Sequence, residues 1–395
     1  MSAILAECAL WRHIYNDPTK APCVRQGELD PNVFVTDLDF DPHAIPGWGD
    51  AGVIDKVCEG IRLAGMRCRP TGNGTDFSII IPTRGSSPRM DALRSVLGCR
   101  VPNGGSIECI LALGNHPSVQ RNRAISLAKG SLVGFLDDDC LVPTDWLERS
   151  AAVISQHCAD IVGGPNVTPA ESSFFGKCVG EVLSSRLGTA MMRARYRPVG
   201  SEPERSGDGK TALCNMVFEK SIFNEFRFNE EMFPNEENEL LSRVIEDGYT
   251  TVYDPRLAVQ HPRKTDLKGF ARQAYGYGHG RADQTKIQPR SLRPIHLMPS
   301  LTFLGAITLP AIALAGPAWL VAFLALCLAS YLMLVIASSA AIAARLRSAK
   351  ALLLSGVLYP ALHFSYGLGF ALGLLGLRGK RQPNQQRVWL LRFTA

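Results

Sequence analysis

The 395-residue sequence predicts an α/β fold, in which a mostly parallel sheet flanked by helices is followed by a C-terminal membrane helical region. Three observations predict it. Short apolar segments rich in β-branched residues alternate with helical segments between residues 77 and 140, an order typical of parallel sheets. Three acidic residues directly follow one of these segments, at 137–139. Long stretches without charged residues lie near the C-terminus.

Four regions are expected along the chain. Residues 1–75 are an N-terminal extension whose fold the pattern does not define; it holds one expected helix, Ala51–Met66, and the segment DLDFD, typical of a solvated edge. It ends in the linker-like PTGNGTD. A sheet domain over 76–293, membrane helices over 294–377 and a basic tail over 378–395 follow.

Within the sheet domain, strands and helices alternate. The segment FSIIIPTRG predicts a strand from Phe77 that stops at Pro82, and IECILALGN predicts a second strand. The segment PSVQRNRAISLAKG predicts a helix with Ser118 as N-cap and Gly130 at its end. The segment SLVGFL then predicts a third, buried strand.

The third strand ends in three adjacent carboxylates, Asp137, Asp138 and Asp139. They should project from the C-terminal edge of the sheet, where open α/β sheets bind ligands. Because adjacent carboxylates repel one another, we expect a positive partner at this edge. The alternative is an exposed acidic turn that caps the helix expected to begin at PTDW.

The stretch from Pro294 to Ala344 contains no Asp, Glu, Lys or Arg. It holds two helices of ~20 residues, each able to cross ~30 Å of hydrocarbon. We therefore expect a membrane hairpin, Leu297–Gly316 and Pro317–Ala344, that turns at AGPAW. The alternative, a large buried helical core, seldom lacks polar faces altogether. A third uncharged segment, Ala351–Leu377, can span, bend or re-enter.

Basic residues indicate the orientation of the hairpin. They lie before it, in the segment from Arg281 to Arg293, and after it, in RLRSAK, which places both ends and the sheet domain in the cytoplasm of a multi-pass protein of the cell (inner) membrane. The tail RGKRQPNQQRVWLLR is also basic, yet a third crossing would place it outside. The sequence alone leaves this conflict open.

Cysteine usage and charge exclude other classes. The eleven cysteines form no CxxC pair and no cleavable signal peptide is expected, which favours a reduced, cytoplasmic domain. The net charge of +6 comes partly from residues beside the membrane and in the tail, so anionic lipid explains it better than nucleic acid, for which no motif is present.

The order of three motifs resembles a known family. SIIIPTRG, QRNRAISLAKGSLVGFLDDDCLVPTDWL and NEENELLSRVIEDGYTTVYDPRLAVQH are similar to the inverting family 2 glycosyltransferases of the GT-A fold. FARQAYGYGHGRA and HFSYGLGFALGLL extend the likeness to the membrane-anchored enzymes of bacterial exopolysaccharide synthesis, the succinoglycan ExoA type. The resemblance covers about Phe77 to Leu377. It implies transfer of one sugar from a nucleotide-sugar donor to a lipid-linked or saccharide acceptor.

The resemblance also implies roles for residues of this chain. Asp137 would face the donor ribose, and Asp139, together with His261 of VQH, would hold a divalent cation, Mn²⁺ or Mg²⁺, which carboxylate oxygens favour. The cation would offset the charge of the leaving diphosphate. The other expected donor-binding residues are Pro82, Thr83, Arg84, Asn115, Arg121, Asn122 and Asp138.

The segment NEENEL should supply the general base that inverting transfer requires. The family usually has Glu-Asp here, so Glu237 takes the position of the base and Glu236 would orient the acceptor. Asn215, Glu239 and Arg272 are expected on the acceptor side. If the segment is helical, Glu239 and Arg243 lie one turn apart and can pair, which would make Glu239 largely structural.

Two departures from the family leave alternatives open. The second strand runs from Gly114 and Asn115 directly into HPSVQRNR, without the aspartate that reads the base in relatives. The Gln-x-x-Arg-Trp signature of processive synthases is absent, which favours single-sugar addition. A noncatalytic partner in a polysaccharide assembly complex is one alternative. A nucleotidyltransferase is another, although PTRGSSPR is a poor version of its Gly-rich phosphate loop.

Overall fold

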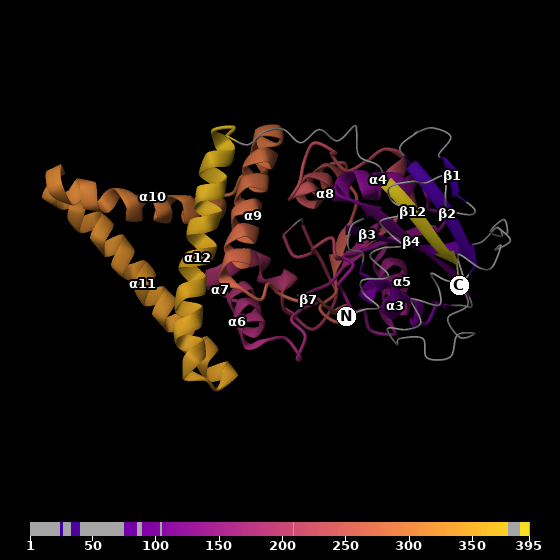
Figure 1. Cartoon of the computed structure of the whole chain (residues 1–395), viewed down its shortest axis with the longest axis horizontal. Coiled ribbons are helices and arrows are strands. Elements are labelled where there is room, and N and C mark those ends of the chain that lie inside the picture. Colours follow the sequence, from indigo (N-terminus) through magenta and orange to yellow (C-terminus); the bar gives the residue numbers. More distant parts are fainter. Residues whose placement is uncertain are drawn as a thin grey trace.

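The computed structural model describes residues 24–26, 33–39, 75–84, 89–102, 105–207, 209–377 and 388–394. Figure 1 shows a sheet domain, two long helices standing side by side against it, and two further helices that project away from the sheet. The expected helix Ala51–Met66 lies outside the described residues. The segment DLDFD overlaps a strand, but its side chains also lie outside them.

The main sheet has the strand order β1-β2-β12-β4-β3-β5-β9-β6-β10-β8. In the seven strands from β4 to β8, five run parallel to one another, and only β9 and β8 run antiparallel to them. This confirms the predicted mostly parallel sheet. The strands are β1 (Val24–Gln26), β2 (Val33–Asp39), β3 (Thr75–Arg84), β4 (Ser106–Gly114), β5 (Leu132–Leu136), β6 (Ile161–Gly163), β8 (Glu204–Arg205), β9 (Asn215–Glu219), β10 (Thr251–Tyr253) and β12 (Val388–Thr394). A second sheet pairs β7 (Asn166–Val167) with β11 (Val259–Gln260).

Helices cover both faces of the main sheet. Ile79 and Ile81 of β3 belong to the apolar cluster that includes α3 (Asp91–Leu97) and α5 (Trp146–His157). The intervening Ile80 belongs to the cluster that includes α4 (Pro117–Leu127) and α8 (Glu236–Glu246). Because successive side chains of a strand point to opposite faces, a continuous apolar run is what a strand between two helical layers requires.

Two expected boundaries are wrong. Strand β3 continues through Pro82 to Arg84. The pairing of β3 with β5 ends at Ile80, so the N–H that Pro82 lacks removes no hydrogen bond to β5. Helix α4 begins at Pro117 after His116, and Ser118 lies inside it, where its hydroxyl donates to the Met232 carbonyl. Proline suits the first helical position because that N–H has no helical acceptor.

The remaining helices are short elements of the sheet domain and the long helices that lead into and form the C-terminal region. Short ones are α6 (Phe174–Leu183), α7 (Arg186–Thr189), η4 (Ala190–Arg195), η5 (Lys220–Asn224) and η6 (Pro289–Ser291). Long ones are α9 (Leu267–Ile287), α10 (Pro294–Ala315), α11 (Ala318–Leu346) and α12 (Ala349–Leu374). Helices α10, α11 and α12 are each long and apolar enough to cross a membrane. Helices α10 and α11 meet at Gly316 and Pro317, where the sequence predicts a turn.

The expected basic tail is part of the sheet. Its last residues form β12, which runs antiparallel to β4 on one side and parallel to β2 on the other. The two ends of the chain therefore both add strands beside β4. Nothing in the local pattern of the tail marks this, because the partner strand is about 280 residues away in the sequence.

Candidate functional site

The site lies where β5 and β11 end. Strand β5 is central, between β3 and β9, and its last residue, Leu136, is buried. The chain leaves the sheet directly after it, which places Asp137, Asp138 and Asp139 at the C-terminal edge as predicted. His261 follows β11, and its backbone N–H donates to the Val167 carbonyl, which extends the second sheet and aims the ring at the three carboxylates.

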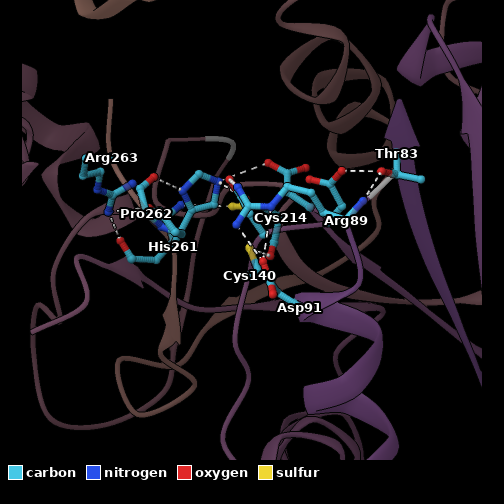
Figure 2. A network of polar contacts seen from close by, with 12 residues as sticks. Thr83, Arg89, Asp91, Cys140, Cys214, His261, Pro262 and Arg263 are labelled. Carbon is cyan, nitrogen blue, oxygen red and sulfur yellow. Dashed lines mark hydrogen bonds and ion pairs between the residues drawn. The ribbon is translucent and has the colours of Figure 1, made fainter. Parts of the chain in front are cut away.

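His261 contacts two of the three aspartates. Its Nε2 lies 3.3 Å from Asp137 Oδ2 and 3.5 Å from Asp139 Oδ1. Its Nδ1–H donates to the Pro262 carbonyl at 2.9 Å, because a carbonyl can only accept. Figure 2 shows this row of contacts, from Arg263 through His261 to Thr83. The ring is therefore held with Nε2 facing the carboxylates.

These atoms fit a divalent cation. Ligands of an octahedral ion held at about 2.1 Å lie about 3 Å apart, close to the separations of Nε2 from the two carboxylates. With Nδ1 committed as a donor, the neutral ring offers a lone pair at Nε2, the usual arrangement of a metal-binding histidine. Asp139 and His261 would hold the ion, with Asp137 beside them. Burial opposes protonation of the ring, but Asp137 and the nearby negative charges raise the pKa of His261 to about 9.

The three carboxylates have different surroundings. Burial would raise the pKa of Asp137, but the His261 ring and the Arg121 guanidinium hold it below its ordinary value. Burial raises the pKa of Asp138 to about 6, in spite of a short hydrogen bond from the Thr83 hydroxyl. Asp138 therefore takes up a proton at a higher pH than Asp137 does.

Residues that the sequence analysis did not select also belong to the site. Arg89 Nη1 lies 3.4 Å from Asp139 Oδ2, and the Arg89 N–H donates to the Thr83 hydroxyl at 3.1 Å. Cys140 and Cys214 lie beside His261, with the sulfur atoms and a ring nitrogen within 4.8 Å of one another. Arg89 is the last residue of the segment PTRGSSPR, which begins in β3. Its positive charge close after β3 is the feature of the sequence that could have pointed to it.

Arg121 joins the carboxylates to α8. Its Nη1 donates to Glu236 Oε1 at 2.5 Å, and its Nη2 lies 3.7 Å from Asp137 Oδ1. Arg121 and Glu236 are buried, and the other oxygen of Glu236 has no hydrogen-bond partner among the described residues. Burial raises the pKa of Glu236 to about 7, although Arg121 opposes this. The two regions that the sequence analysis treated as donor and acceptor sides are thus in contact.

Glu237 has a more open position than Glu236. Its side chain is 21% exposed, and its nearest charged partner is Arg195 Nη1 at 3.9 Å. Arg195 also donates a short hydrogen bond to Asn238. Glu239 faces the other way, and its carboxylate accepts from Arg243 at 2.7 and 2.9 Å. The predicted Glu239–Arg243 pair is confirmed, and it holds Glu239 in a structural role.

Asn215, expected on the acceptor side, and Asn122, expected to bind the donor, both make contacts within the protein. Asn215 is fully buried; it accepts from Trp146 Nε1 and donates to the Pro165 and Leu257 carbonyls, so it does not line the acceptor side. Asn122 is buried and fixes the loop after Phe228 through both ends of its amide, so it does not reach a donor. The remaining expected residues stay accessible: Pro82 is half-buried at the end of β3, and Arg84, Asn115 and Arg272 are exposed.

Comparison with known proteins assigns part of the chain. Residues 78–199 match the model of the family described as glycosyl transferase family 2. This segment is therefore similar to a family 2 glycosyl transferase domain. It contains β3, β4, α4, β5 and the three aspartates, whereas Glu236, Glu237 and His261 lie beyond the matched residues. No curated protein matches the chain.

Solved structures give weaker likenesses. The mannosyltransferase PcManGT from Pyrobaculum calidifontis, in complex with GDP-Man and Mn²⁺, is 15% identical with a TM-score of 0.47, over 84% of this chain and 98% of that one. TarS 1-349 from S. aureus, in complex with UDP, is 14% identical with a TM-score of 0.37, over 79% of this chain and 96% of that one. Both likenesses are too low to transfer an activity.

Proposed function

We propose that the protein is an inverting, single-addition glycosyltransferase that moves a sugar from a nucleotide-sugar donor to a lipid-linked or saccharide acceptor at the membrane. The observation that carries this is the meeting of Asp137, Asp139 and His261 Nε2 at one edge of a family 2 domain. Arg121 connects this group to the acidic start of α8. A cation site and a candidate base are thus joined in one cluster.

The donor would bind at the C-terminal edge of the sheet. A divalent cation bound there would offset the charge of the leaving diphosphate. Asp139 and His261 would hold the cation, and Asp137, which contacts His261 and Arg121, is placed to accept from the donor ribose. Thr83 and Arg84 end the neighbouring strand, where the backbone of β3 leaves the sheet beside β5. Arg89 adds a positive charge beside Asp139.

The acceptor would bind beside the start of α8. An inverting reaction needs a base that removes the proton of the acceptor hydroxyl as its oxygen attacks. Glu237 is ionisable and partly exposed, and no charged partner closer than 3.9 Å occupies its oxygens among the described residues. Glu236 is held by Arg121 and buried, so it is suited to positioning. We assign the base to Glu237 and place Glu236 behind it.

The membrane is part of the proposal. Helices α10 and α11 would anchor the protein, and the basic residues beside them favour a cytoplasmic sheet domain at the cell membrane. Lys268 and Arg272 are exposed on α9, the helix that leads to the anchor. Their charges suit the phosphates of a lipid-linked acceptor. A role in exopolysaccharide synthesis would follow from such an acceptor.

A donor-hydrolysis screen tests the proposal. The full-length protein in detergent is incubated with UDP-, GDP- and TDP-sugars, with Mn²⁺ or Mg²⁺ and with EDTA, and nucleotide release is measured. We expect release from one donor class that requires the cation. Binding of a donor without release or transfer would favour the noncatalytic partner. Release of pyrophosphate from a nucleoside triphosphate and a sugar phosphate would favour the nucleotidyltransferase.

A further inference from the structure

We propose that the chain crosses the membrane only twice, through α10 and α11, and that α12 lies along the cytoplasmic membrane surface with a leucine-rich face in the lipid. The inference rests on the membrane anchorage in the proposed function and adds its topology. Helix α12 has the length and hydropathy of a span, so composition alone does not distinguish the two arrangements.

The strand after α12 limits the number of crossings. Strand β12 pairs with β4 from Trp389 opposite Leu113 to Thr394 opposite Glu108. Val388 and Leu390 are buried in the cluster that α4 covers, and Arg392 Nη1 lies 3.7 Å from Glu108 Oε2. A strand inside a sheet must lie on the same side of the membrane as that sheet. The residues between β11 and β12 therefore cross an even number of times.

The contacts of α12 with the sheet domain indicate that α12 is the helix that does not cross the membrane. Around its middle, Tyr359 donates to the Ser185 hydroxyl at 2.9 Å, and His363 Nε2 lies 3.0 Å from the Leu187 carbonyl. Near its end, Lys286 Nζ of α9 donates to the Gly373 carbonyl at 2.5 Å. Both halves of α12 thus lie against helices that belong to the sheet domain. A helix that crossed ~30 Å of hydrocarbon would carry one end away from that domain.

The pairing of α12 with α9 is close and built from glycine. A Cβ on Gly369 would lie 2.1 Å from the Tyr275 carbonyl oxygen, and a Cβ on Gly278 would lie 2.0 Å from the Tyr366 carbonyl oxygen. The motifs GYGHG and GLGFALG are therefore the two sides of one helix pair, visible side by side in Figure 1. Helix α9 carries charged residues, including Asp283 and Lys286, which excludes a position in hydrocarbon for this pair.

The face of α12 away from α9 is apolar. Helices α10 and α11 cover its middle, where the Phe364 ring lies 6.0 Å from the Phe303 ring and 6.2 Å from the Tyr331 ring, and the parts on either side are exposed. The exposed side chains of this face are Leu352, Leu353, Val357, Leu368 and Leu374, and Leu375 and Leu377 follow directly. Lipid is the occupant we assign, because this face continues the exposed apolar surface of α11 and begins beside the basic residues Arg347 and Lys350. An amphipathic helix with such flanks lies in the interface, with its apolar side in the acyl chains.

Depth measurements test the position of α12. A fluorescent amino acid is placed at Leu353, Val357, Leu368 or Leu375 of the full-length protein in phosphatidylcholine–phosphatidylglycerol vesicles. Position Leu326, 66% exposed in α11, is the matched control. Quenching by lipids with a nitroxide at acyl carbon 5 or 12 is compared. We expect the carbon-12 lipid to quench best at Leu326 and the carbon-5 lipid to quench best at all four positions in α12.

The contrary results are distinct. If α12 spanned the membrane, the carbon-12 lipid would quench best at Val357 and Leu368 and the carbon-5 lipid best at Leu353 and Leu375. This result would overturn the proposal. Lack of quenching at all four positions, with cross-links between copies, would assign the face to a second chain and would also overturn it. Quenching and cross-linking do not require catalysis. A negative result for the position of α12 is therefore distinguishable from a lack of the proposed enzyme activity.

A sidedness experiment tests the crossing number. An epitope tag is placed after Ala395 and, in a second variant, between Gly316 and Pro317. Protease is added to inside-out and right-side-out vesicles. We expect the C-terminal tag and the sheet domain to be cleaved together in inside-out vesicles, and the tag in the turn to be cleaved only in right-side-out ones. A C-terminal tag cleaved only in right-side-out vesicles would show three crossings and contradict the proposal.

Discussion

Arg121 of α4 donates to Glu236 of α8 at 2.5 Å, and both side chains are buried. The same guanidinium reaches Asp137 at 3.7 Å and lies over the Phe228 ring at 5.6 Å. One arginine thus connects the carboxylates of the sheet edge with the helix that carries the candidate base. Arg121 lies within the segment that matches the family 2 model and contacts Glu236 beyond it, so it links the two parts of the proposed site.

Removing this link should destabilise the protein. Arg121→Met leaves Glu236 buried without its partner, and loss of one member of a buried ion pair costs ~3–5 kcal/mol. Arg123→Met, on the same helix, removes a partly exposed pair with Glu230 and should cost ~1 kcal/mol or less. Denaturant unfolding in detergent measures both. Equal, small losses in the two variants would contradict the buried link.

The raised pKa of Glu236 gives a pH dependence. Because the carboxyl ionises near 4.5 in the unfolded chain and at about 7 in the folded protein, the folded state binds more protons between these values. Glu236 therefore makes the free energy of unfolding fall as the pH rises from about 5 to 8. Glu236→Gln lacks this effect, so its stability relative to the wild type should increase over that range. A difference that stays constant or decreases would show that Arg121 outweighs burial.

Glu237 is expected to act in the chemical step. General-base catalysis contributes ~10²- to 10⁴-fold, so Glu237→Gln should lower kcat by about that factor with little change in donor affinity. Glu246→Gln, exposed at the end of the same helix, is the matched control and should keep its turnover. Turnover and donor binding are measured separately. Normal turnover in Glu237→Gln would move the base to another carboxylate.

The C-terminal strand should contribute to the stability of the sheet. Arg392 is buried beside Glu108, whose carboxylate also accepts from the Ser78 hydroxyl and the Lys129 N–H at 2.5 Å each. Arg392→Met removes the positive charge and should cost about 3 kcal/mol of unfolding free energy. Arg100→Met, in an exposed pair with Glu148, should leave it almost unchanged. Thermal unfolding compares them, and equal melting temperatures would place Arg392 outside the core.

The sequence predicted those features that depend on neighbours in the chain. Strand β5 and its three aspartates follow from an apolar run that ends in charge, and the pair Glu239–Arg243 follows from helical spacing. The hairpin of two long apolar helices, α10 and α11, follows from the absence of charge between Pro294 and Ala344. In each case a short segment contains the whole physical cause.

The rest depends on partners far apart in sequence. Asn215 was expected to face an acceptor, but Trp146 and two carbonyls surround its amide, and only the folded sheet brings them together. The contact of Arg89 with Asp139 and the pairing of β12 with β4 are of the same kind. No local propensity encodes them, so the sequence alone left the tail as a separate segment.

The most direct test of the account is cation-dependent sugar transfer by the full-length protein. Transfer from the donor found by the screen is measured with Mn²⁺, after EDTA, and after Mn²⁺ is restored, for the wild type, Asp139→Asn and Asp145→Asn. Asp145 is the matched control because it lies outside the cluster, at the start of α5. We predict that EDTA abolishes transfer and Mn²⁺ restores it in the wild type and in Asp145→Asn, whereas Asp139→Asn stays inactive while folded. Undiminished wild-type transfer in excess EDTA would contradict the account.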